Sequence, residues 1–90
     1  MATAGAGPSG WATLNGLQYP LMGWELFEGD PASPHMCRGW FRCEAVDFSA
    51  PRGTELGLQL EREDGTERPL AARIEAARTT EPEWEFRAER

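Results

Sequence analysis

Strict alternation of apolar with polar residues is the feature of this sequence that most constrains its fold. Within the segment ELGLQLE, residues 55–61, the apolar positions are Leu56, Leu58 and Leu60. A second alternating set follows the Asp64-Gly65 dipeptide and consists of Leu70, Ala72, Ile74 and Ala76. Successive side chains of a strand point to opposite faces, so each segment is predicted to be a strand with one apolar face.

A helix over residues 67–78 is the competing interpretation of the second segment. The stretch ERPLAARIEAAR is rich in good helix formers and has a proline near its start. Leu70, Ile74 and Ala77 would then lie on one stripe of that helix. We favour the strand, because its apolar positions match those of Leu56, Leu58 and Leu60 across the intervening turn.

The hydrophobic pattern also predicts how these strands pair. A two-residue turn at Asp64-Gly65 would leave Leu70 and Ile74 on the wet face, because a shift of one residue reverses every side chain. A three-residue loop, residues 64–66, with Gly65 in the left-handed conformation avoids this. It predicts the pairs Leu60–Leu70, Leu58–Ala72 and Leu56–Ile74. Across the following turn the same parity predicts the pairs Ile74–Phe86 and Ala76–Trp84.

The rest of the chain is also predicted to be β-structure. Asn15-Gly16 between two apolar stretches is a strong signal for a tight hairpin. Residues 1–10, rich in glycine and alanine, are expected to be a flexible tail, and residues 11–90 a single small domain. The predicted fold is all-β: an antiparallel meander of five or six strands curled into a small barrel or roll, which hides one apolar face of the sheet.

Charge limits the classes of partner. The chain carries 15 acidic residues against nine basic ones, all arginine, for a net charge of −6. Nucleic-acid binding needs clustered cations, so direct contact with nucleic acid is not expected. A partner protein, one carrying basic residues in particular, fits this charge better. No signal-peptide pattern or membrane-spanning apolar run is found, so the sequence predicts a cytoplasmic protein without membrane contact.

The segment HMCRGWFRC, residues 35–43, concentrates the residue types that carry chemistry. In a strand, Cys37 and Cys43 are separated by ~20 Å, too far for a disulfide or for one zinc ion. No second histidine is present to complete a zinc site, and His35 is interpreted as an ordinary loop residue. We therefore predict no metal site, and two reduced, buried thiols that act as small apolar residues.

The opposite face of the same strand carries the candidate binding residues Arg38, Trp40 and Arg42. A tryptophan between two arginines can form a planar platform that stacks on a partner or binds its carboxylates. In the alternative, Trp40 packs in the core while both arginines pair with acidic residues of the chain itself. Cys37, Phe41 and Cys43 form the better core set, so the arginine and tryptophan face is predicted to be exposed.

No catalytic constellation and no glycine-rich phosphate loop is found, so neither an enzyme nor a bound cofactor is expected. The leading hypothesis is a non-enzymatic protein-interaction module that uses exposed strand edges together with the Arg38, Trp40 and Arg42 face. Free edges also allow the chain to form a homo-oligomer. Two alternatives stay open: an acidic inhibitor that mimics nucleic acid at a basic site, and a small-molecule binder with a barrel lined by tryptophan.

Overall fold

A computed structural model describes residues 3–27, 35–77 and 82–89 of the chain, and in these residues it is all-β. The strands are β1 (Thr3–Gly7), β2 (Ser9–Leu14), β3 (Leu17–Leu21), β4 (Gly23–Phe27), β5 (Met36–Arg42), β6 (Glu55–Glu61), β7 (Glu67–Ala77) and β8 (Glu83–Glu89). The all-β prediction is confirmed, and residues 67–77 form a strand instead of the alternative helix. Within the described ranges no helix is suited to crossing a bilayer.

A long bent hairpin explains why eight strands are found where five or six were expected. Pro8 alone separates β1 from β2, and Met22 alone separates β3 from β4. The predicted turn joins the two arms, with Asn15 and Gly16 at positive φ angles of 53° and 80°. β2 pairs with β3 beside this turn and β1 pairs with β4 farther along, so each arm counts as two strands.

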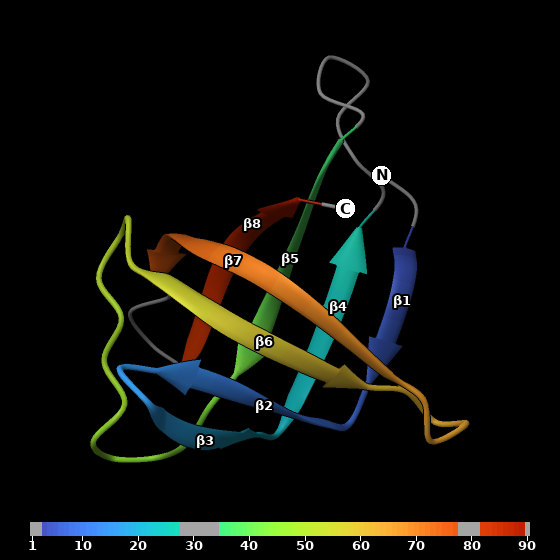
Figure 1. Cartoon of the computed structure of the whole chain (residues 1–90), viewed down its shortest axis with the longest axis horizontal. Helices are drawn as coiled ribbons and strands as arrows, with labels where there is room; N and C mark the ends of the chain where they lie inside the picture. Colours follow the sequence, from blue (N-terminus) through green and yellow to red (C-terminus); the bar gives the residue numbers. More distant parts are fainter. Residues whose placement is uncertain (1–2, 28–34, 78–81, 90) are drawn as a thin grey trace.

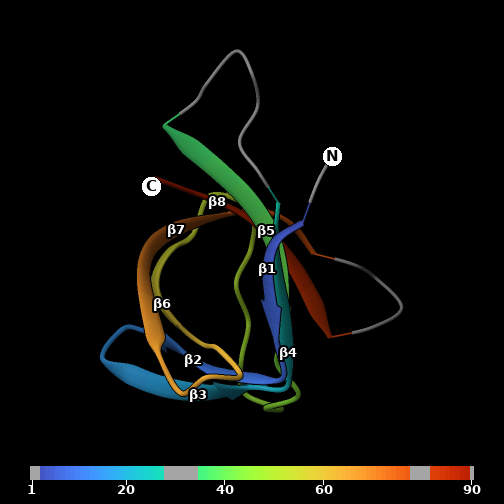
Figure 2. The ribbon, with the colours of Figure 1, turned by 90° about the vertical axis from the view of Figure 1, so that its right-hand side faces the viewer.

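All strand pairs are antiparallel, in the order β1-β4-β5-β8-β7-β6-β2-β3. The order departs from a simple meander at three neighbouring pairs that are not consecutive in the sequence, namely β1–β4, β5–β8 and β6–β2. The sheet curls into a half-barrel with β1, β4 and β5 on one side and β6 and β7 on the other (Figures 1 and 2). Both edge strands, β1 and β3, belong to the bent hairpin.

The N-terminal segment differs from the expected flexible tail. Residues 3–7 pair with β4, and Ser9 and Gly10 pair with β6. The Trp24 indole of β4 donates hydrogen bonds from Nε1 to the backbone oxygens of Ser9, at 2.8 Å, and Glu61, at 3.3 Å. A Cβ atom at Gly7 would lie 2.5 Å from the Glu61 oxygen and 2.8 Å from the indole nitrogen, so this approach requires glycine. The small residues of this segment, which are typical of flexible tails, therefore allow the strands to pack closely here.

The register of β6 against β7 is shifted by two residues from the predicted one. The observed pairs are Leu58–Leu70 and Leu56–Ala72. The same residues face inward as predicted, but the predicted pairs Leu60–Leu70, Leu58–Ala72 and Leu56–Ile74 are wrong. The loop has three residues, as expected, but they are 63–65: Arg62 N donates to Thr66 O at 2.8 Å and Gly65 N to Arg62 O at 3.0 Å. Gly65, at φ 85°, occupies the last loop position, where a type I turn followed by a bulge needs a left-handed residue.

The pairing of β7 with β8 is partly as predicted. Ile74 lies opposite Phe86, which confirms that pair. A bulge between Ile74 and Ala76 then places Ala76 opposite Glu85 and Ala77 opposite Trp84, so the predicted pair Ala76–Trp84 is wrong. Strict alternation cannot reveal a bulge, because the extra residue changes the parity only beyond it.

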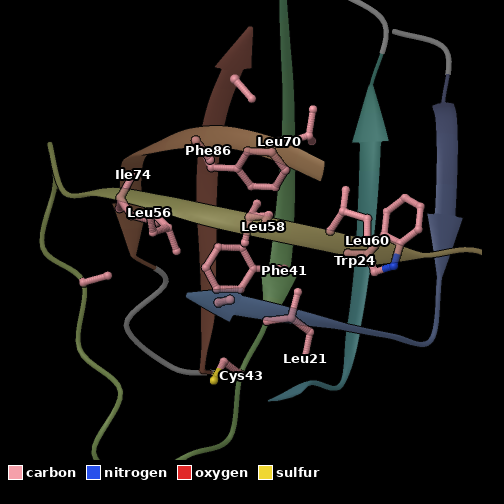
Figure 3. Packing of buried hydrophobic residues seen from close by; sticks show 14 of the residues in the cluster. Leu21, Trp24, Phe41, Cys43, Leu56, Leu58, Leu60, Leu70, Ile74 and Phe86 are labelled. Carbon is pink, nitrogen blue, oxygen red and sulfur yellow. The ribbon is translucent and has the colours of Figure 1, made fainter. Parts of the chain in front are cut away.

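The core fills the inner face of the curled sheet. Its largest fully buried side chains are Phe41, Phe86, Leu58, Leu60, Ile74 and Cys43. Figure 3 shows Phe41 and Phe86 pointing into the same interior as the leucines of β6. The loop after β5 closes one end: Phe48 is buried and packs edge-on against Tyr19 and Trp84, with ring centroids 5.1 and 4.8 Å away.

Candidate functional site

The candidate site is the outer face of β5, which is fixed by the burial of the opposite face. Cys37, Phe41 and Cys43 are all in the core, as predicted. Arg38, Trp40 and Arg42 therefore point outward; Arg38 is exposed, and Trp40 and Arg42 are half-buried. We call these three residues, together with the outward residues of β4, β7 and β8 beside them, the β5 face.

Trp40 lies between two acidic residues on neighbouring strands. Glu25 of β4 and Glu85 of β8 are its cross-strand partners. The indole Nε1 donates a hydrogen bond to Glu25 Oε1 at 3.0 Å. This bond fixes the edge of the ring, so the indole is a preformed apolar surface with its polar atom already satisfied.

Arg42 has a structural role. Its guanidinium lies 3.1 Å from Glu44 Oε1 and 3.6 Å from Glu83 Oε2. Glu83 is only 7% exposed, and it is the charged residue that the structure buries within the described part of the chain. A buried carboxylate needs a cationic partner, so Arg42 is engaged within the fold. This matches the alternative in which the arginines pair with the chain's own acids.

Arg38 behaves differently from Arg42. It is exposed, and no carboxylate of the described residues forms an ion pair with it. Its cross-strand neighbours are Phe27 on β4 and Arg87 on β8. The three predicted residues thus lie on one face but differ in their interactions. Arg42 forms ion pairs, Trp40 is held by a hydrogen bond, and Arg38 is exposed to solvent.

A hollow of about 340 Å³ lies beside Arg38 and Trp40. Its other walls include Phe27, Glu75, Ala76 and Glu85. The bulge in β7 makes room for it, because it places the small Ala76 in the cross-strand row of Trp40 and Glu85. The same bulge brings Glu75 Oε1 to 2.8 Å from Arg87 Nε. Bulges commonly redirect side chains in this way.

The thiols of the segment 35–43 have no place in the site. Cys37 and Cys43 are both free and buried, which confirms the prediction of two buried thiols. Burial raises the pKa of Cys43 above its ordinary 9.0; a backbone hydrogen bond with Ala45 lowers it, and the Asp47 charge raises it further. A neutral, enclosed thiol is a poor nucleophile. His35 is exposed, and no cluster of three potential metal ligands occurs in the ranges described.

Sequence reasoning missed several members of the β5 face, namely Phe27, Glu75, Ala76, Glu85 and Arg87. One signal was available: the predicted pair Ile74–Phe86 also places Arg73 opposite Arg87. The pairing of β5 with β8 left no such signal, because a long connection and two other strands separate them in the sequence.

The sequence matches no protein-family model, and comparisons with curated proteins and with solved structures give no significant match. The β5 face must therefore be interpreted from its own chemistry.

Proposed function

We propose that this protein is a non-enzymatic protein-interaction module that binds its partner with the β5 face. The observation that carries the proposal is a combination of three features: an exposed arginine, Arg38, that has no carboxylate partner among the described residues, an anchored tryptophan, Trp40, and a hollow that both residues line. Tryptophan and arginine are the residue types that contribute most often to binding energy at protein interfaces.

The arrangement favours this function over the two alternatives. Arginines interrupt the acidic residues of the β5 face, whereas a mimic of nucleic acid needs a continuous negative surface. Of the four tryptophans, Trp24 is in the core and Trp84 packs against it, while Trp11 and Trp40 point outward. Core side chains occupy the inner face, so the tryptophans favour an outer contact surface over a lined internal cavity.

The experiment is a comparison of partner retention. Tagged wild-type protein and the variants Trp40→Ala and Trp11→Ala are isolated from the cells that produce the protein. Trp11 is the matched control, because it is 39% exposed on the outer face of β2, away from β5. We expect wild type and Trp11→Ala to retain the same partner and Trp40→Ala to lose it by at least tenfold.

Circular dichroism establishes that both variants are folded before retention is compared. Two results would contradict the proposal. One is equal retention by the two tryptophan variants. The other is a wild-type protein that stays strictly monomeric in size-exclusion chromatography with light scattering and retains no partner.

A further inference from the structure

Three arginines lie side by side in one row across the outer face of the sheet. Arg73 of β7 is opposite Arg87 of β8, and Arg87 is opposite Arg38 of β5. Like charges directly opposite each other on neighbouring strands destabilise a sheet. A chain with net charge −6 and 15 acidic residues could readily place acids here, so the row calls for a physical explanation.

Two of these arginines have carboxylate partners within the fold. Arg73 is bound by Glu55 of β6, and Arg87 Nε lies 2.8 Å from Glu75 Oε1. Arg38 ends the row, and within the described ranges no carboxylate pairs with it. Its neighbour on the other side is Phe27, and it borders the hollow that Trp40 also lines. Among the described residues, the row therefore lacks a carboxylate partner at Arg38, where it adjoins the apolar side chains of Phe27 and Trp40.

We infer that Arg38 binds a carboxylate of the partner protein, and that the apolar side chain beside this carboxylate lies in the hollow against Trp40 and Phe27. The inference rests on the proposed function and names the chemistry of the partner at that surface. The planar guanidinium forms two parallel hydrogen bonds with one carboxylate. Arg87, on the neighbouring strand, adds positive charge beside it, although Glu75 partly neutralises this residue.

One carboxylate fits this site better than a polyanion. Arg38 is the one arginine of the row without an acidic partner among the described residues, and Glu75 and Glu85 also line the hollow. A nucleic-acid strand carries a negative charge at every nucleotide, and these acids would repel the adjacent phosphates. A protein segment can present a single carboxylate next to an apolar side chain.

The test is a titration of the ¹⁵N-labelled full chain with three tripeptides, followed at Arg38 Nε–H and Trp40 Nε1–H. The first is acetyl-Leu-Glu-Leu-amide, which carries a side-chain carboxylate. The second is acetyl-Leu-Gln-Leu-amide, which is its neutral match. The third is acetyl-Leu-Gln-Leu with a free C-terminus, so that its only carboxylate is the C-terminal one. We expect saturable shifts with at least one of the charged peptides, at least tenfold tighter than with the neutral one, and the tighter of the two identifies the source of the carboxylate.

Two arginine variants make the test specific. Arg38→Gln is expected to weaken binding of the charged peptide at least tenfold, with amide resonances outside the β5 face unchanged. Arg62→Gln is the matched control, because Arg62 is exposed in the turn between β6 and β7 and is not among the residues that line the hollow. Equal binding of charged and neutral peptides, or tighter binding of single-stranded oligothymidylate at the same resonances, would overturn the inference.

The inference and the proposed function can fail separately. If the partner is retained through Trp40 but Arg38→Gln retains it equally well, the module stands and the carboxylate contact is wrong. If the charged peptide binds at Arg38 but no protein is retained through Trp40, the carboxylate site stands and the proposed function fails.

Discussion

Gly39 occupies a crowded position in β5. A Cβ atom there would lie 2.3 Å from the Glu25 backbone oxygen and 2.9 Å from the Phe86 ring. The Phe86 side chain covers the glycine from the neighbouring strand, which restores packing where a side chain is missing. The glycine therefore allows β4, β5 and β8 to curl tightly beneath the β5 face.

We expect Gly39→Ala to lower the free energy of unfolding by about 2–3 kcal/mol, because the backbone must move to admit the methyl group. Gly57→Ala is the matched control on β6, where the nearest atom to the new Cβ, that of Thr13, is 3.9 Å away. The control is expected to leave stability unchanged or to raise it by up to ~1 kcal/mol. Urea unfolding measures both changes, and equal effects would contradict this account of the curl.

At the scale of elements, the loop between β5 and β6 closes one end of the core. Phe48 packs against Phe41 as well as Tyr19 and Trp84, while Val46 in the same loop is fully exposed. We expect Phe48→Ala to cost about 3–5 kcal/mol of unfolding free energy and Val46→Ala less than about 0.5 kcal/mol. Thermal unfolding followed by tryptophan fluorescence checks this, and a stable Phe48→Ala variant would show that the loop does not close the core.

The hairpin between β6 and β7 gives the protein a pH-dependent element. The Thr66 hydroxyl and then its backbone N–H donate to Asp64 Oδ1, at 2.6 and 2.9 Å, and lower the pKa of that carboxyl. A lowered pKa stabilises the fold above the unfolded-state pKa of ~3.9, and this stabilisation is lost as the pH falls through the lower folded-state pKa.

The difference in unfolding free energy between wild type and Asp64→Asn should therefore be largest at neutral pH and should shrink towards pH 3. Urea unfolding at a series of pH values measures it. A difference that stays constant over this range would show that the ionised carboxylate contributes nothing to the hairpin.

How much of the fold could be predicted depends on the element. Alternation predicted which residues of β6 and β7 face inward, because a register shift of two residues leaves every side chain on the same face. The pair Ile74–Phe86 was also predicted correctly. The register of β6 against β7 required the exact position of Gly65 in the loop, which parity does not contain. Strand formation by residues 3–7 had no local signal, since it depends on Trp24 and Glu61, distant in the sequence.

At the scale of the whole molecule, the candidate site combines residues of β4, β5, β7 and β8, and only the residues of β5 were predicted from the sequence. Arg38, Trp40 and Arg42 were found because the opposite face of β5 is strongly apolar. Their different interactions could not be predicted, because Glu83, which pairs with Arg42, and Glu25, which binds Trp40, lie on other strands. The hollow depends on the bulge before Ala76, which no alternation pattern reveals.

The most direct measurement of the central claim is site-specific photocrosslinking in the cells that produce the protein. p-Benzoylphenylalanine is placed at position 85, where Glu85 of β8 is exposed on the β5 face beside the hollow, and in a separate variant at position 59, where Gln59 is exposed on the outer face of β6. We predict a covalent adduct with one partner protein at position 85 and at most a trace at position 59. An adduct at position 59 with none at position 85 would contradict the account.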